Sequence, residues 1–302
     1  MTIRERMLYK AGLAAGFLGK SAELVAGFVK SNQNPDGGFR GRSNESDLYY
    51  TMFGSDSLVA LKSKPVYPIG KFISKYVSTE SLDFVHLCSL INLLTARLQT
   101  EQNTMETGEF EIISINIKQM AEKIEKYRSA DGGYNVIEKS FRSSIYGSFL
   151  AISVLEETGA PLTNAPSIID SIRKLESNDG GFANELGMKE GTTTATAAAI
   201  ILLNKLGCDI QSEKTDWLLK MLHKSGGFLA SPSTPIPDLL STATALHCLS
   251  EIGFDMSKIR EQCLDYLDSL WSGEGAFYGN WVDEKTDVEY TFYGLLALGS
   301  LL

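Results

Sequence analysis

The sequence of 302 residues contains few of the side chains that bind metals or form disulfides, with three histidines and four cysteines. The cysteines stand singly in apolar helical stretches, without a CxxC pair or the spacing of a disulfide framework: Cys88, Cys208, Cys248 and Cys263. This pattern is typical of a reducing compartment, so we expect a cytoplasmic protein. The histidines are equally isolated along the chain, and we expect neither a metal site nor another cofactor.

Basic residues are fewer than acidic ones, 28 against 37, which gives a formal net charge of −9. A chain without a basic surface does not release counterions from phosphates, which argues against nucleic acid and anionic membranes as partners. Long hydrophobic runs are missing too. The run AGLAAGFLG at residues 11–19 ends at Lys20 and is far shorter than the ~20 apolar residues of a membrane span. It predicts a buried first helix rather than a signal peptide.

Two glycines followed by an aromatic residue recur along the chain. The pattern begins at Asp36, Asp131, Asp179 and Ser225, and in a weaker form at Glu274. These positions are 95, 48, 46 and 49 residues apart, which indicates a unit of about 47 residues and one unit without the pattern. A fixed period of this size predicts a repeat architecture. Six such units account for almost all of the 302 residues, and with 43% apolar residues we expect residues 1–302 to form a single domain.

Two kinds of helix alternate between the glycine turns. Helices with one apolar face precede the turns and predict a surface layer, at residues 21–31, 167–177, 214–225 and 260–272. Helices that are apolar or small nearly all round follow the turns and predict burial on both sides, at residues 47–62, 143–159, 192–207, 238–253 and 287–302. The unit without the glycine pattern supplies residues 67–78 and 82–98, and residues 99–109 predict an exposed connection.

Each unit therefore consists of an outer helix, a glycine turn, a loop and an inner helix. Six such units predict an all-α fold, an α/α toroid in which six outer helices surround six inner ones. We expect the last helix, residues 287–302, to close the ring against the first inner helix, residues 47–62. Glycine permits the positive φ of the turn, and the aromatic residue after it packs inward and fixes the turn.

This pattern resembles the protein prenyltransferase β-subunits and the terpenoid cyclases, which share the α/α toroid. The resemblance rests on the repeated turns and on the sequences DLYYT at 47–51 and DVEYTFYGLLALGSL at 287–301, which are most similar to the β-subunits of geranylgeranyl and farnesyl transferases. It covers essentially the whole chain. It implies a central cavity for an isoprenoid or other apolar small molecule, chemistry at the inner-helix N-termini, and an α-subunit-like helical protein as a partner.

The zinc site that the transferases carry is incomplete here. In that family, zinc is held by the Asp and Cys of a DxC sequence opening the fifth inner helix and by a His opening the sixth. Asp238 matches the Asp, but Leu240 and Tyr290 occupy the Cys and His positions. Pro232 and Pro235 replace the Arg and Lys that the family presents to the diphosphate. Because leucine cannot bind a metal, we expect no zinc and no ordinary zinc-dependent prenyl transfer.

The terpenoid cyclase branch implies a second chemistry, in which the middle Asp of a DxDDTA sequence protonates an alkene. DVEYTF at residues 287–292 places Glu289 at this middle position, next to Asp287, whereas DLLSTA retains only Asp238. We therefore take Glu289 as the candidate acid, supported by Asp287 and Asp238, because like charges in a shared buried site raise the pKa of one of them. A lone glutamic acid suits an allylic or epoxide substrate better than a plain polyene.

The aspartates at the predicted starts of the inner helices also have a structural interpretation. Asp47, Asp238 and Asp287 each open a predicted inner helix, where a carboxylate caps free N–H groups without any catalytic role. Aromatic residues also gather at the inner-helix N-termini, and we predict that six of them line a substrate cavity: Tyr49, Tyr50, Phe53, Tyr146, Tyr290 and Tyr293. A filled aromatic core fits the same pattern.

Three interpretations of function stay open. The protein is an isoprenoid-processing enzyme with a rebuilt zinc-free site, a non-catalytic toroid that binds an isoprenoid or other apolar ligand, or a toroid that binds a protein partner. We favour a prenyltransferase-like isoprenoid-binding protein and leave its catalytic status open, because the lost zinc ligands and the family resemblance point in different directions.

Overall fold

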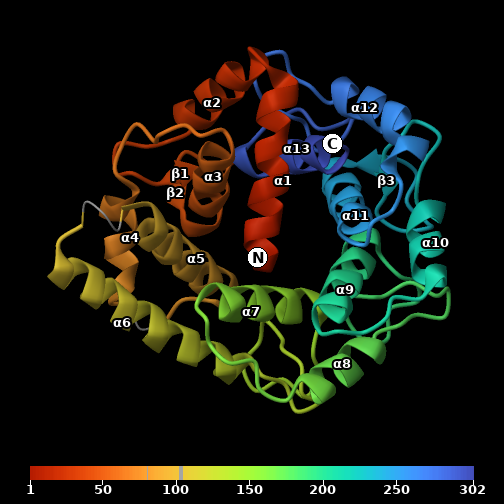
Figure 1. The fold of residues 1–302 in the computed structure, drawn as a ribbon, viewed down its shortest axis with the longest axis horizontal. Coiled ribbons are helices and arrows are strands. Elements are labelled where there is room, and N and C mark those ends of the chain that lie inside the picture. Colours follow the sequence, from red (N-terminus) through yellow and green to blue (C-terminus); the bar gives the residue numbers. More distant parts are fainter. Residues whose placement is uncertain (80, 102–104) are drawn as a thin grey trace.

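The structure is a computed structural model that describes residues 1–79, 81–101 and 105–302. In these residues the helices form two concentric layers around a ring, and one further helix lies inside it (Figure 1). The α/α toroid predicted from the repeats is therefore confirmed.

The inner layer follows the chain around the ring: α3 (Leu48–Ala60), α5 (Phe84–Glu101), α7 (Ile145–Glu157), α9 (Thr193–Lys205), α11 (Leu239–Glu251) and α13 (Val288–Ser300). The outer layer alternates with it: α2 (Ser21–Ser31), α4 (Ile69–Val77), α6 (Thr107–Ile124), α8 (Ala165–Arg173), α10 (Ser212–Lys220) and α12 (Arg260–Ser269). Neighbouring inner helices pack against each other, and α13 packs against α3, so the last unit meets the first.

The glycine turns join the two layers as predicted. Gly226 has φ of 93°, and a side chain there would collide with the backbone of Gln262 in the next unit, so only glycine fits. The aromatic residue that follows is buried, and its N–H donates to a hydroxyl on the inner helix, as from Phe228 to Thr242 Oγ1 at 2.9 Å. Two of these loops carry short antiparallel pairs, β1 (Phe39–Arg40) with β2 (Ser46–Asp47) and β3 (Phe228–Leu229) with β4 (Pro237–Asp238).

Helix α1 (Ile3–Leu18) lies inside the ring, with its N-terminal end near the centre (Figure 1). It packs closely on α13 because Ala11 and Ala14 are small and Gly299 leaves room for the Lys10 carbonyl. The predicted first helix is therefore present, but it is buried on one side only, since Tyr9 and Phe17 are exposed.

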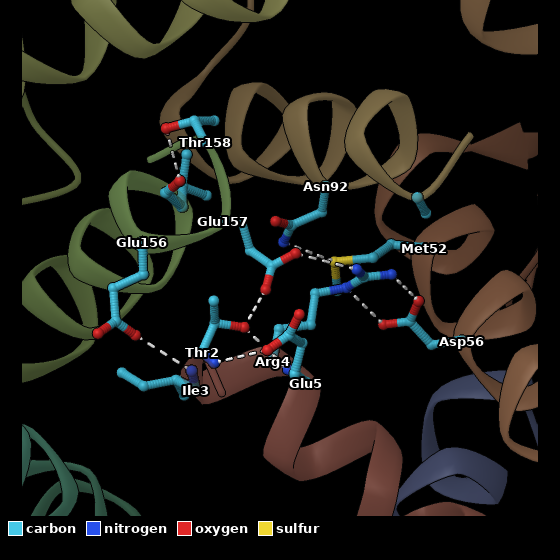
Figure 2. Close-up of polar contacts among 12 residues, drawn as sticks. Thr2, Ile3, Arg4, Glu5, Met52, Asp56, Asn92, Glu156, Glu157 and Thr158 are labelled. Atoms are coloured by element: carbon cyan, nitrogen blue, oxygen red, sulfur yellow. Dashed lines mark hydrogen bonds and ion pairs between the residues drawn. The ribbon is translucent and has the colours of Figure 1, made fainter. Parts of the chain in front are cut away.

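A buried charge cluster holds the N-terminal end of α1 (Figure 2). The Arg4 guanidinium pairs with Asp56 near the end of α3 and lies 3.4 Å from Glu157 at the end of α7. The side chains of these three residues are at most 6% exposed. Thr2 caps the helix, and its hydroxyl also bonds to Glu157. Because Asp56 and Glu157 lie toward the C-terminal ends of their helices, α1 covers that end of the ring.

Two sequence predictions need correction. The exposed connection predicted at residues 99–109 is partly helical, because α5 extends to Glu101 and α6 begins at Thr107, while residues 102–104 lie outside the described part of the chain. Cys208 follows α9 in a loop instead of lying within a helix. Searched over the described residues, no helix has the length and apolar character needed to cross a membrane.

Candidate functional site

A cavity of about 410 Å³ lies inside the ring, bordered by α3, α7, α9, α11, α13 and by α1 at its base. Equivalent positions of the repeats line it, because the second residue of each of these five inner helices faces the cavity. We call this set the opening layer: Tyr49, Tyr146, Thr194, Leu240 and Glu289. Tyr146 is 41% exposed, so the layer opens to solvent on the side opposite α1.

Deeper positions follow the same helical stripe of i, i+4 and i+7. Ala198, Thr244 and Tyr293 occupy the sixth positions of α9, α11 and α13. Below them, Ile201 and His247 occupy the ninth positions of α9 and α11, and with Met7 of α1 they form what we call the floor. The cavity walls are therefore mostly apolar, with polar groups at both ends.

Glu289 is the acidic group of this cavity. Its Oε1 accepts a hydrogen bond of 2.6 Å from Tyr49 Oη, which joins the last unit to the first. Burial raises the pKa of Glu289, the charge of Asp287 acts in the same direction, and the Tyr49 hydrogen bond and Arg42 only partly oppose them. The carboxyl group therefore holds its proton to higher pH than an exposed glutamate does.

Three tyrosines surround this acid. Burial raises the pKa of Tyr49 and of Tyr293 well above the usual value, and it raises the pKa of Tyr146 to about 12. All three are therefore neutral phenols at physiological pH. Phe53, which we predicted to line the cavity, lies behind them, with ring centroids 4.9 Å from Tyr49 and 5.4 Å from Tyr293.

Asp287 and Asp238 lie outside the cavity lining. Asp287 Oδ1 accepts the N–H of Tyr290 at 2.9 Å and thereby caps α13, while its Oδ2 accepts from Arg42 Nε at 2.8 Å. Asp238 caps α11 and accepts both the N–H and the hydroxyl of Ser241 at 2.8 Å. Burial raises the pKa of Asp238, against the opposing bonds from Ser241. Their contacts match the capping interpretation of both aspartates.

Tyr50 and Tyr290 also lie outside the lining, at the third positions of α3 and α13. The Tyr290 ring lies 5.4 Å from the guanidinium carbon of Arg42, and the Tyr50 ring covers Gly41. The structure therefore brings Tyr49, Tyr146, Tyr293 and Glu289 together around the cavity and places Phe53, Tyr50, Tyr290 and the two aspartates around its outside.

The residues present do not fit the zinc of the transferases. Leu240 lies in the opening layer at the position of the expected thiolate and offers no donor atom. Tyr290, at the position of the expected imidazole, contacts Arg42. Across residues 1–79, 81–101 and 105–302, no three His, Cys, Asp or Glu side chains are grouped to hold a metal ion.

The sequence predicts isolated histidines, but two of them have defined surroundings in the structure. His86 Nε2 lies 2.9 Å from Asp47 Oδ2, and its Nδ1 lies 2.5 Å from Asp83 Oδ2. His247, which we did not predict as a site residue, reaches the cavity floor. The signal for it was present in the sequence, because Leu240, Thr244 and His247 follow the i, i+4, i+7 spacing of one helical face.

An α/α toroid with an apolar cavity at its centre is the architecture described above. A family model of the prenyltransferase alpha-alpha toroid domain matches residues 13–215 and 195–301, and the chain belongs to this family. A comparison with curated protein sequences finds no match.

Solved structures with the same fold include two enzymes in complex with small molecules. A variant of the type II terpene cyclase MstE from Scytonema, in complex with geranylgeranyl dihydroxybenzoate, is 13% identical with a TM-score of 0.51, over 95% of this chain and 97% of the cyclase. A protein from Actinoplanes is 12% identical with a TM-score of 0.57, over 93% and 98% of the two chains. Candida albicans protein geranylgeranyltransferase-I, complexed with GGPP, is 16% identical with a TM-score of 0.50, over 99% and 82%. At these identities the likeness shows the fold alone.

Proposed function

We propose that the central cavity binds an isoprenoid chain and that Glu289 protonates an epoxide or allylic group at its polar end. The observation that carries this proposal is the Glu289 carboxyl group, held by Tyr49 in the opening layer of an apolar cavity. A volume of about 410 Å³ lies within the range of small-molecule sites, ~300–1,000 Å³. The cyclase and transferase of the same fold, which were solved with geranylgeranyl compounds, support the ligand class.

The cavity suits an acid-initiated reaction. The raised pKa lets Glu289 hold its proton to higher pH than an exposed glutamate does, and the protonated carboxyl can donate to an epoxide oxygen, after which the C–O bond opens to leave a cation on carbon. Tyr146 and Tyr293 line the same cavity, and aromatic rings can stabilise positive charge in an apolar interior. The carboxylate that remains keeps the hydrogen bond from Tyr49.

A second candidate function is a non-catalytic toroid that binds an apolar ligand or a protein partner. The capping contacts of Asp238 and Asp287 favour it, because they assign a structural role to two of the three proposed catalytic carboxyl groups. Ile112 and Ile115 are exposed on α6 and would suit an α-subunit-like helical partner. The four free thiols agree with the proposed cytoplasmic location.

Replacing Glu289 by Gln keeps the shape of the side chain and removes the acid. We expect product formation from isoprenyl diphosphates or epoxides to fall at least a hundredfold, as the loss of a general acid does, while ligand binding is retained. The parent enzyme should lose activity as the pH rises through the raised pKa of Glu289. Unchanged turnover in the variant would remove Glu289 from the mechanism. A parent protein that binds these compounds without turning them over would support the second candidate.

The pH dependence of the unfolding free energy provides a control for the Glu289→Gln variant. Since the pKa of Glu289 is raised by folding, the parent loses stability as the pH rises from the unfolded value near 4.5 through the folded pKa. The Gln variant lacks this loss. The unfolding free energy of the variant minus that of the parent should therefore increase across that pH window and then stay constant. Urea unfolding at several pH values measures it, and a pH-independent difference would contradict the buried acid.

Replacing Tyr293 by Ala should weaken binding of a fluorescent geranylgeranyl analogue about tenfold, because its ring is part of the cavity wall. Tyr50→Ala is the matched control, since Tyr50 lies outside the lining and should leave the affinity unchanged. Circular dichroism checks that both variants keep their helices. Equal losses of affinity in the two variants would point to a general structural effect. A parent protein that binds no analogue would indicate a filled core.

A further inference from the structure

The floor of the cavity contains a polar residue that the proposed reaction does not use. His247 is the ninth residue of α11, whereas Glu289 is the second residue of α13, and both helices run from the opening layer toward α1. With a rise of 1.5 Å per residue, His247 lies about 10 Å deeper than the opening layer. Helix α1 meets α11 at this end of the cavity, because Arg6, the neighbour of Met7, pairs at 2.8 Å with Glu251, one turn beyond His247.

The His247 imidazole is buried without a full set of partners. The residue is 3% exposed, and within the described part of the chain its Nδ1 has no hydrogen-bond partner. Burial, and then the charges of Lys10 and Arg6, lower the pKa of His247 to about 3, so the ring is neutral. A neutral imidazole has one donor and one acceptor, and an unpaired one destabilises a buried site.

The other floor residues do not supply the missing partner. Met7 and Ile201 are apolar, and Thr244, one turn above His247, donates its hydroxyl proton to the Leu240 carbonyl at 2.9 Å. The side chain lines the cavity floor, and a half-turn of the ring about χ2, which leaves its shape almost unchanged, brings Nδ1 to the opposite edge. A polar group that enters from the cavity is therefore the natural partner of this side chain.

We propose that the floor is a second polar subsite, in which His247 hydrogen-bonds a hydroxyl or carbonyl group at the far end of the ligand. This inference rests on the proposed function and narrows its substrate class. The ligand is an isoprenoid with polar groups at both ends, about 10 Å apart along the cavity axis. One group meets Glu289 in the opening layer, and the other meets His247. A chain with an apolar end leaves the imidazole unpaired and binds more weakly.

The experiment compares matched alcohols on the full chain. Isothermal titration calorimetry measures the binding of geraniol and farnesol, each beside its ω-hydroxylated derivative, to the parent, His247→Phe and His247→Gln proteins. We expect the parent to bind one of the ω-hydroxylated compounds about tenfold more tightly than its plain alcohol. His247→Gln keeps a donor and an acceptor and should retain most of this preference. His247→Phe should lose it and bind the plain alcohol at least as tightly.

Tyr50→Phe, outside the cavity lining, is the control and should leave the ω-hydroxyl preference unchanged. Thermal melting checks folding, and His247→Phe should melt no lower than the parent because it removes an unpaired buried group. If the parent binds each plain alcohol and its ω-hydroxylated derivative with equal affinity, the subsite proposal is overturned while isoprenoid binding stands. An undiminished preference in His247→Phe would have the same meaning. If the parent binds none of the four alcohols, both the proposed isoprenoid binding and the proposed subsite at His247 are overturned. If His247→Phe does not fold, the parent and His247→Gln decide the question.

Discussion

Replacing Arg4 by Ala is expected to lower the unfolding free energy by about 3–5 kcal/mol, because it leaves buried carboxylates without their cation. Asp56 and Glu157 both face Arg4, and neither side chain is more than 6% exposed. The helix end that they hold is the part of α1 nearest the centre of the ring (Figure 1). Urea denaturation followed by circular dichroism measures the change.

Arg6 offers a matched control on the same helix. Its side chain is 46% exposed and pairs with Glu251, so Arg6→Ala should cost less than about 1 kcal/mol. The comparison separates burial from the mere loss of a charge, because both residues are arginines of α1 that each pair with an acidic partner. Equal small losses in the two variants would show that the charge cluster contributes nothing specific to holding α1.

A chain that ends before Asp287 should fail to form the cooperative fold. It lacks α13, whose Val288, Phe292, Leu295 and Leu296 are each at most 2% exposed. Burying four such side chains contributes about 6–12 kcal/mol, which is comparable with the whole stability of a domain, about 5–15 kcal/mol. The packing faces of α1, α3 and α11 would then meet water and promote aggregation.

Size-exclusion chromatography and thermal melting test this prediction. A chain that lacks only Leu302, which is 46% exposed, is the control and should fold normally. If the shorter chain is monomeric and melts cooperatively, closure of the ring by α13 is not required for stability, and the inner helices are held by their sequential neighbours alone.

The two helical layers could be predicted because helices with one apolar face and helices that are apolar all round alternate along the chain, with a glycine turn between them. The outer helix predicted at residues 21–31 coincides with α2, and the inner helix at 287–302 contains α13. The location of α1 was not predictable, because a helix of alanine, glycine and scattered aromatics does not indicate which surface it covers. Helix α6 mixes exposed Ile112 and Ile115 with buried Ile113, so its apolar face is hard to define from sequence.

The composition of the site was only partly predictable, because helical phase decides which side chains reach the cavity. Tyr49 and Glu289 occupy second positions of their helices and face inward, whereas Tyr50 and Tyr290, one residue later, face away. Residue type alone suggested all four. The catalytic role of Glu289 and the binding roles of the tyrosines stay predictions, which the variants above test.

The hydrogen bond between Tyr49 and Glu289 also has a consequence for folding kinetics. It joins residues 240 positions apart, and the Arg42–Asp287 pair beside it joins residues 245 positions apart. Bringing such distant segments together costs about 5 kcal/mol of chain entropy from the length-dependent contribution alone. Contacts of this range slow folding, whereas an open solenoid grows by adding each repeat to its neighbour. The environment of the proposed acid therefore forms only when the first and last units of the ring meet. An intermediate with native-like helices but an open ring would lack the Tyr49–Glu289 contact.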